Sequence, residues 1–195
     1  MKNCDECDNE QENGMAVQYK DSHVMLSKAR TIFLAEEVTS NLASQIIAML
    51  LYFDKENPEL PIHMYIHSVG GSIHGLFGIY DVMQMIRAPI ITICAGECYS
   101  AAAIILAAGT KGYRMAMKNS KIMIHGLQCL WPLPGIDVKN SQKYHTFLKQ
   151  LNENVMETLA QHSGQSLDKV RKDCLEDVWF SPNDAKRYGI IDRII

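Results

Sequence analysis

Residues 90–108 read IITICAGECYSAAAIILAA. The run Ile90–Cys94 is almost continuously apolar, which is typical of a strand buried on both faces of a parallel sheet. The alanine and aliphatic residues of Ser100–Ala108 predict a buried helix. A tight turn over Gly96–Ser100 would join the two elements. The stretch therefore predicts a strand, a turn and a helix, the unit from which α/β folds are built.

Similar units lie on both sides of this stretch. Strands are predicted at residues 30–34, 62–66, 113–117, 121–124 and 190–195. Helices are predicted at residues 42–51, 72–87 and 141–161, with short ones beginning at Ser166 and at Ser181-Pro182. The alternation of strands and helices predicts one α/β domain over residues 24–195. Residues 1–23 are polar and acidic, and we expect a mobile segment there.

Composition narrows the classes of function. The chain has 195 residues, of which 47% are hydrophobic and 21% charged, with a net charge of −3. No basic run predicts a nucleic-acid partner, and no apolar run reaches the roughly 18 residues of a membrane span. The N-terminus is the reverse of a signal peptide, so we expect a cytoplasmic protein with reduced cysteines. Cys4 and Cys7 have the spacing of half a zinc site, but no second pair completes it, and no metal is expected.

Ser100 and His125 could form a catalytic pair. A serine hydroxyl is a weak nucleophile that needs a neighbouring base, a carboxylate to orient that base, and N–H donors for the oxyanion. His125 directly follows the predicted strand 121–124. The two side chains would thus meet at the carboxyl ends of neighbouring strands, where α/β sheets place functional groups. On pattern alone, a capping serine and a hydrogen-bonded strand-end histidine remain the simpler interpretation.

The pattern does not choose the third group. The candidate carboxylates all lie late in the chain: Asp173, Glu176, Asp177 and Asp184. Asp184 fits a capping box with Ser181. Asp177 precedes an apolar run that could bury it beside the sheet edge. The Gly70-Gly71 turn follows another strand, and glycine there lets the backbone approach a substrate closely.

Four segments, in the same order along the chain, together resemble the ClpP family of serine peptidases. They are IHSVGGSIHGLFGIYDVMQMI, TICAGECYSAAAIILAAGTKGYRMAMKNSKIMIH, HSGQSL and WFSPNDAKRYGIIDRII. The resemblance covers residues 24–195 and is far more specific than a lone serine motif. It implies a crotonase-like α/β fold of repeated β-β-α units with a protruding handle, over residues 126–161.

The resemblance also implies a site. Ser100 would be the nucleophile, His125 the general base and Asp177 the third member of the triad. The backbone N–H groups of Gly70 and Ala101 would stabilise the oxyanion. The chain itself would need no cofactor.

The family assembles as two stacked heptameric rings that enclose the active sites. By resemblance, unfolded polypeptides would be delivered by an AAA+ ATPase such as ClpX, ClpA or ClpC, and the partner would use the ATP. Tyr65 keeps one of the aromatic residues that dock the ATPase, while its neighbour is His63.

Several positions depart from the family pattern. Val69 replaces a proline beside the glycine turn, and Cys98-Tyr99 and Ala101-Ala102 replace the usual residues around the nucleophile. Pro132 and Pro134 fall in a segment that the family uses for substrate pairing and ring stacking, where proline cannot donate ladder hydrogen bonds. Leu175-Glu176 replaces an acidic-arginine pair that the family uses between rings.

The departures leave alternatives open. We expect the isolated chain to assemble poorly, or only with a second ClpP-type subunit. A weakly active or regulatory subunit of a mixed ring is one alternative function. A crotonase-fold acyl-CoA enzyme is another, and such enzymes generally need no Ser-His-Asp set.

Overall fold

The computed structural model describes residue 26 and residues 29–128 and 138–195. The predicted N-terminal segment and residues 129–137 of the predicted handle therefore lie outside the described residues. The strands are β1 (Thr31–Leu34), β2 (Ile62–Ser68), β3 (Ile90–Tyr99), β4 (Arg114–Ala116), β5 (Lys121–Ile124), β6 (Val178–Phe180) and β7 (Arg193–Ile194). The helices are α2 (Ser40–Glu56), α3 (Ile73–Met85), α4 (Ala101–Ala107), α5 (Val138–Ser163), α6 (Leu167–Asp173) and α7 (Pro182–Tyr188).

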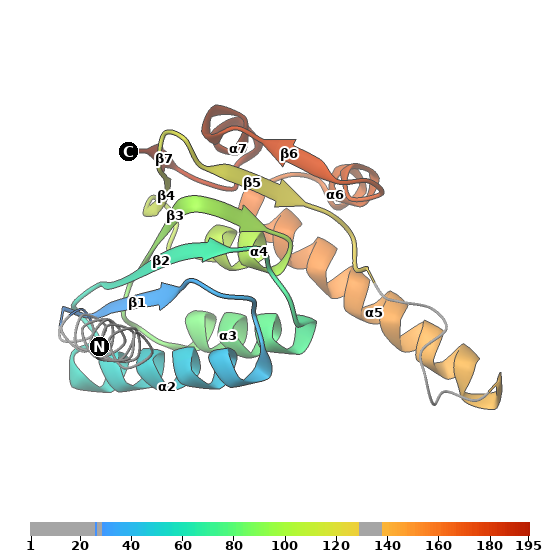
Figure 1. The fold of residues 1–195 in the computed structure, drawn as a ribbon, viewed down its shortest axis with the longest axis horizontal. Helices are drawn as coiled ribbons and strands as arrows, with labels where there is room; N and C mark the ends of the chain where they lie inside the picture. The colour runs from blue at the N-terminus through green and yellow to red at the C-terminus, as the bar shows by residue number, and fades with distance from the viewer. Residues whose placement is uncertain (1–25, 27–28, 129–137) are drawn as a thin grey trace, which may run out of the picture.

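These strands form one mixed sheet in the order β1-β2-β3-β4-β7, with β5 paired to β3 and β6 paired to β5. All pairs are parallel except β5–β6. Helices α2, α3 and α4 pack together and against β1, β2 and β3 (Figure 1). The α/β prediction is confirmed, because strands and helices alternate along the chain and the crossovers produce parallel pairing.

The predicted turn at Gly96–Ser100 is wrong, because β3 continues through these residues to Tyr99. The ladder with β2 shifts there: Ile66 pairs with Cys94, whereas Ser68 pairs with Cys98. Gly96 takes a φ of 106°, which an L side chain adopts at a cost. The extra residues form a bulge that bends the strand. Consequently, the first part of β3 pairs with β4 and its last part pairs with β5.

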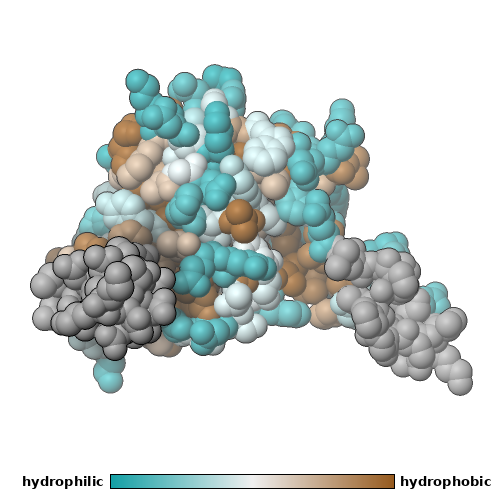
Figure 2. Space-filling model, viewed as in Figure 1, coloured by the Kyte–Doolittle hydropathy of each residue, from teal (hydrophilic) through white to brown (hydrophobic). Residues whose placement is uncertain are grey.

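The core surrounds α4. Every residue of this helix is buried, as its alanine and aliphatic composition predicted. The largely apolar faces of α2 and α3 complete this core together with the inner residues of the strands. Leu34 of β1, Leu50 of α2 and Ile79 of α3 are fully buried there. On the face drawn in Figure 2, polar and apolar residues are interspersed.

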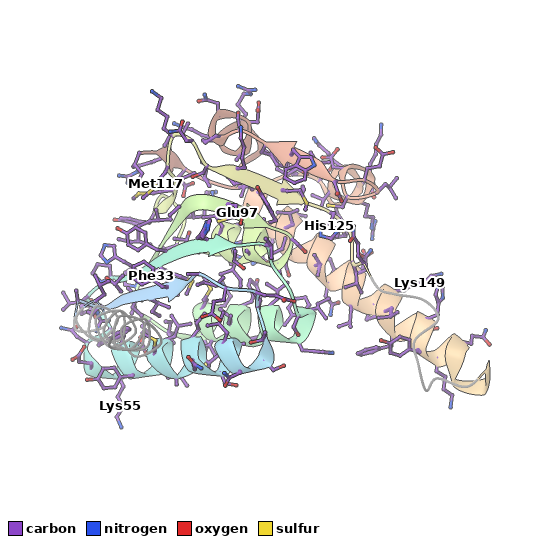
Figure 3. All side chains as sticks on the ribbon, viewed as in Figure 1. Phe33, Lys55, Glu97, Met117, His125 and Lys149 are labelled. Carbon is purple, nitrogen blue, oxygen red and sulfur yellow. The ribbon has the colours of Figure 1, made fainter. Side chains whose placement is uncertain are left out.

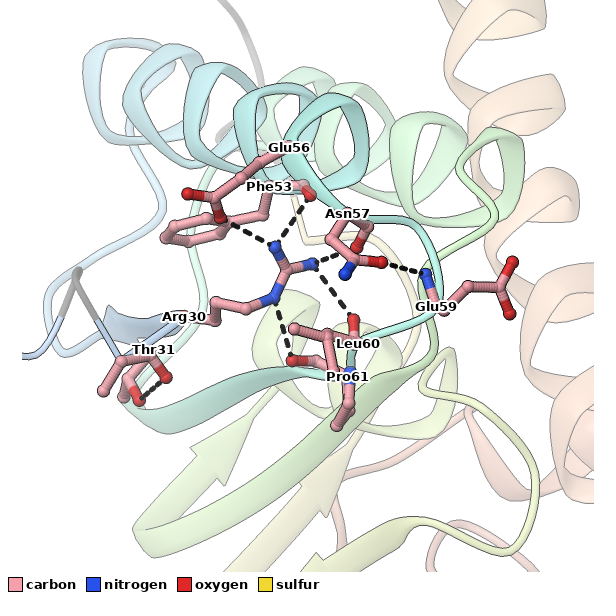
Figure 4. Close-up of polar contacts among 9 residues, drawn as sticks. Arg30, Thr31, Phe53, Glu56, Asn57, Glu59, Leu60 and Pro61 are labelled. Carbon is pink, nitrogen blue, oxygen red and sulfur yellow. Dashed lines mark hydrogen bonds and ion pairs between the residues drawn. The ribbon is translucent and has the colours of Figure 1, made fainter.

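Arg30 fastens the end of α2 to the turn that leads into β2. Its guanidinium donates to the carbonyls of Phe53, Asn57 and Leu60 and to the carboxylate of Glu56 (Figure 4). A guanidinium carries five donors in a fixed fork, which suits this converging set of acceptors. The turn is therefore held from one buried side chain.

The C-terminal part departs from prediction in two places. Strand β6 was not predicted as a strand, and β7 spans Arg193–Ile194 rather than all of residues 190–195. The capping box of α7 is confirmed: Ser181 accepts from the Asp184 N–H, and Asp184 accepts from the Ser181 N–H.

Helix α5 begins at Val138, three residues before the start predicted from the apolar pattern. Its last turns pack on α4 and α6, while its N-terminal part projects away from the rest of the fold (Figure 1). A protruding long helix agrees with the protruding handle that the family resemblance implies, whereas the bounds of the handle, 126–161, stay a prediction.

Candidate active site

Ser100 joins β3 to α4 in an unusual backbone conformation. Its φ and ψ are 54° and −124°, and it is one of two non-glycine residues with positive φ in the described residues. Such strain persists only where the surroundings impose it, and it is concentrated at functional sites. Here the Ser100 N–H donates to the carbonyl of Met123 on β5 at 2.9 Å. The hydroxyl makes no capping hydrogen bond, so the structure does not support the interpretation of Ser100 as an ordinary helix cap.

His125 lies directly after β5, beside α5 (Figure 3). It lines a cleft of about 400 Å³ together with Ser100, as expected from the parallel pairing of β3 with β5. Its Nδ1 atom is buried and has no hydrogen-bond partner within the described residues. Buried polar atoms are nearly always paired, so this atom calls for an explanation.

Asp177 directly precedes β6, the strand that pairs with β5 just before His125. The antiparallel ladder pairs Ile122 with Phe180 and ends with Ile124 opposite Val178, so His125 and Asp177 are the residues that flank its last pair. Nevertheless, Asp177 is exposed, and in the described part of the chain no hydrogen bond joins it to His125. Its place in a triad stays a prediction, with a register that permits it.

The glycine turn packs against the nucleophile from β2. A Cβ added to Gly70 would lie 2.6 Å from the Tyr99 carbonyl oxygen, 2.8 Å from the Ser100 Cβ and 3.0 Å from the Ala101 nitrogen. The Gly70 N–H donates to the Ser68 hydroxyl at 3.1 Å, so this predicted oxyanion donor is engaged within its own turn. Ala101 lines the cleft as the first residue of α4, a position whose N–H has no intrahelical acceptor.

The chain after His125 is held from two sides. The Gly126 N–H donates to the Cys174 carbonyl at 2.9 Å, and the Leu127 N–H donates to the Asn152 side chain at 2.7 Å. Asn152 belongs to α5, so the long helix helps to fix the wall of the cleft. The sequence offered no signal for Asn152, because an isolated asparagine on a helix is usually a surface residue.

The thiols near the cleft are not plausible nucleophiles. Burial raises the pKa of Cys98, and this thiol is fully enclosed in the core. Burial, with a smaller contribution from Asp173, also raises the pKa of Cys174 to about 11. A thiol must ionise to react, so both favour the inert form at neutral pH.

The walls of the cleft differ in character. Its depth is apolar, with Leu76 from α3, Ile104 from α4 and Val155 from α5. At its rim, Tyr99 lines the cleft and meets the ring of Trp179 from β6 edge to face, with ring centroids 5.0 Å apart. The contact between Tyr99 and Trp179 was not predicted, since it depends on the pairing of β5 with the unpredicted strand β6.

Two further classes of site, a metal centre and a membrane span, are absent from the described residues. No group of three or more His, Cys, Asp or Glu side chains there could hold a metal ion. None of the helices in the same residues is both long enough and apolar enough to span a bilayer.

Comparison with known proteins shows the family of this chain. A model of the Clp protease family matches residues 12–195. The chain is 38% identical over 181 residues to the ATP-dependent Clp protease proteolytic subunit 3 of Parasynechococcus marenigrum (strain WH8102), covering 91% of this chain and 88% of the relative. It is 37% identical, with the same coverage, to the protein of the same name from Synechococcus sp. (strain CC9605). The chain therefore belongs to the Clp protease family.

Proposed function

We propose that this chain is a serine endopeptidase subunit that hydrolyses unfolded polypeptides through Ser100. One observation carries the proposal: Ser100 sits in a strained backbone conformation, without a capping bond, in the cleft that His125 also lines. The family membership and the 38% identity to a proteolytic subunit support it. The acyl-CoA enzyme considered from the sequence is not favoured by that membership.

The proposed chemistry is acyl transfer. The Ser100 Oγ attacks the carbonyl carbon of the scissile peptide bond while the His125 Nε2 takes its proton. The same proton passes to the departing amine, leaving an ester on Ser100. Water, deprotonated by His125, then hydrolyses the ester and restores the serine.

Asp177 is the proposed orienting carboxylate. The His125 Nδ1, which has no partner among the described residues, is the atom that would donate to it, and the two residues flank the last pair of the β5–β6 ladder. A carboxylate there fixes the imidazole tautomer and stabilises the imidazolium. In this proposal, a small movement of the exposed Asp177 completes the set.

Ala101 and Gly70 are the proposed oxyanion donors. The Ala101 N–H needs no rearrangement, since it heads α4 without an intrahelical acceptor. The Gly70 N–H would turn from the Ser68 hydroxyl, which accepts from it in this structure, toward the oxyanion. Gly70 and Gly71 have φ values of 94° and 145°, which residues with side chains rarely adopt.

We further propose that the chain works in an assembly. The matched relatives are named as proteolytic subunits of ATP-dependent proteases. On this basis the chain would form stacked heptameric rings, alone or with a second ClpP-type subunit. A separate AAA+ ATPase such as ClpX, ClpA or ClpC would unfold substrates and hydrolyse the ATP.

Peptide hydrolysis by the assembled protein tests the proposal. Wild type should cleave an internally quenched peptide, and Ser100→Ala should lose at least about a thousandfold in kcat. Ser120→Ala is the matched control, because Ser120 binds the Cys94 carbonyl at the β3 bulge rather than lining the cleft. Equal rates for wild type and Ser100→Ala would refute the proposal. Light scattering of the same sample would show whether this chain alone forms the two-ring particle.

A further inference from the structure

Three residues form one row across β3, β5 and β6. Tyr99 pairs with Met123, and Met123 pairs with Trp179. Neighbours directly opposite each other in paired strands project to the same face of a sheet. The buried residues Ile122 and Ile124 alternate with Met123, so this row lies on the face away from the helical core.

His125 belongs to the same face. It follows Met123 by two positions, the period at which side chains of an extended chain return to one side. The apolar depth of the cleft comes instead from α3, α4 and α5, on the opposite side of the strands. The cleft therefore has an aliphatic side and a side that carries Tyr99, with Ser100 between them, and Trp179 extends this aromatic side beyond the cleft lining.

The aromatic side is ordered but incompletely covered. The rings of Tyr99 and Trp179 meet at 73°, an edge-to-face arrangement that holds both side chains in place. Burial, and then the hydrogen bond with the Glu97 carboxylate, raise the pKa of the Tyr99 phenol, so the ring stays neutral. Trp179 nevertheless remains 58% exposed. A fixed pair with this much open ring surface can accept a further apolar side chain.

The course of acyl transfer determines which substrate residue would contact the Tyr99–Trp179 pair. In acyl transfer by a Ser-His pair, the histidine returns its proton to the departing amine, so the leaving group lies on the histidine side. Tyr99 and Trp179 share that side with His125. The acyl group occupies the other side, next to the oxyanion donors.

We propose that Tyr99 and Trp179 form a binding surface for the side chain of the residue that follows the scissile bond, and that they favour an aromatic residue there. The inference rests on the proposed peptidase function, to which it adds a specificity determinant. Aromatic pairs contribute about 0.5–1.5 kcal/mol beyond simple burial, which corresponds to about two- to tenfold in kcat/KM.

Hydrolysis of matched peptides provides the first test. Two internally quenched peptides would differ only after the scissile bond, one carrying Phe and the other Ala. Wild type should prefer the Phe peptide by about two- to tenfold in kcat/KM, and Tyr99→Ala and Trp179→Ala should bring the ratio close to one. Tyr99→Phe should retain the preference. Tyr113→Ala, which removes an exposed ring outside the cleft, should also retain it.

The ratio is measured within one enzyme preparation, so a loss of folded protein does not change it. A wild-type ratio of one, or an unchanged ratio in Tyr99→Ala, would overturn the inference.

Binding separates this inference from the proposed function. The same two peptides would be titrated by calorimetry into Ser100→Ala, in which no hydrolysis can occur by the proposed route. Tighter binding of the Phe peptide, lost in Ser100→Ala/Tyr99→Ala, supports the surface even if wild type proves inactive. Equal binding of both peptides, in a protein that hydrolyses peptides through Ser100, overturns the surface and leaves the peptidase intact.

Discussion

Two polar clusters on the same sheet are arranged in opposite ways. Between β4 and β7, the buried Arg114 side chain meets Asp192 at 2.7 Å and donates to the carbonyls of Ala107 and His162. In the cleft at the ends of β3 and β5, the His125 Nδ1 has no partner in the described residues, and Ser100 carries backbone strain.

The difference shows that the Arg114 cluster contributes to stability, whereas the groups in the cleft are arranged for chemistry. A buried charge costs free energy unless it is paired, and the Arg114 cluster supplies both a carboxylate and carbonyl acceptors. In the cleft, unpaired groups cost stability but remain available to a substrate or to a change in conformation. We therefore expect substitutions in the two clusters to affect different measurements.

The largest expected effect comes from Asp177→Asn. If Asp177 orients His125 during catalysis, the amide should hold the wrong tautomer and lower kcat by up to about 10⁴-fold. The thermal unfolding midpoint should hardly change, since Asp177 is exposed and unpaired within the described residues. Glu176→Gln, one residue earlier and also exposed, is the control. A loss of less than tenfold in Asp177→Asn would exclude it from the triad.

Asp192→Asn should lower stability and leave kcat unchanged, which is the reverse of the result expected for Asp177→Asn. Removing one partner of a buried ion pair typically costs about 3–5 kcal/mol, because the other charge is left uncompensated. The Arg114 side chain is 4% exposed, so solvent cannot replace the lost carboxylate. Urea denaturation should show the loss, with kcat per folded subunit unchanged. Asp168→Asn, whose ion pair with Arg171 is exposed, should cost less than about 1 kcal/mol. Equal losses in the two variants would contradict the comparison.

Gly70→Ala should damage both properties. The added Cβ would collide with the Tyr99 carbonyl and the Ser100 Cβ, and the φ of 94° adds strain. We expect a loss of about 2–3 kcal/mol in stability and a fall in kcat as Ser100 and Ala101 shift. Gly112→Ala is a matched control, because its φ is 90° but nothing lies within 4 Å of the added atom. It should cost only the strain, about 1 kcal/mol, and leave kcat intact. Identical kcat values in the two variants would argue against close packing at Ser100.

The smallest expected effect is a pH dependence at His162. Burial, followed by the charge of Arg114, lowers the pKa of this imidazole, whose Nε2 lies 3.1 Å from the Tyr80 hydroxyl. The folded state therefore prefers neutral His162. Its contribution to stability is complete above the unfolded pKa of about 6.5 and is lost as the pH falls toward the lowered folded pKa.

The unfolding midpoint should therefore drop between pH 7.5 and pH 5.5, and His162→Gln should flatten this part of the profile. An unchanged slope in His162→Gln would assign the dependence to other groups.

Much of the fold could be predicted from local patterns. Apolar runs located most strands, and the caps at Ser166 and Ser181 located two short helices. Strand β6 was not predicted, because three residues show too little periodicity and only the pairing with β5 makes this segment a strand. The extension of β3 to Tyr99 was not predicted, because its bulge depends on the neighbouring strands.

The candidate site was predictable in position but not in detail. Parallel strands ending at one edge were enough to bring Ser100 and His125 together. The positive φ of Ser100, the bond from Gly70 to Ser68 and the contact of Tyr99 with Trp179 are set by tertiary packing. None of these three features can be read from the order of residues in the sequence.

Labelling by a fluorophosphonate tests the central claim most directly. Trypsin should release residues 88–111, a peptide in which Ser100 is the only serine. We predict one phosphonyl group on Ser100 in the assembled wild-type protein, and none on this peptide in Ser100→Ala. An unlabelled Ser100 in an assembled sample that hydrolyses peptides would contradict the account.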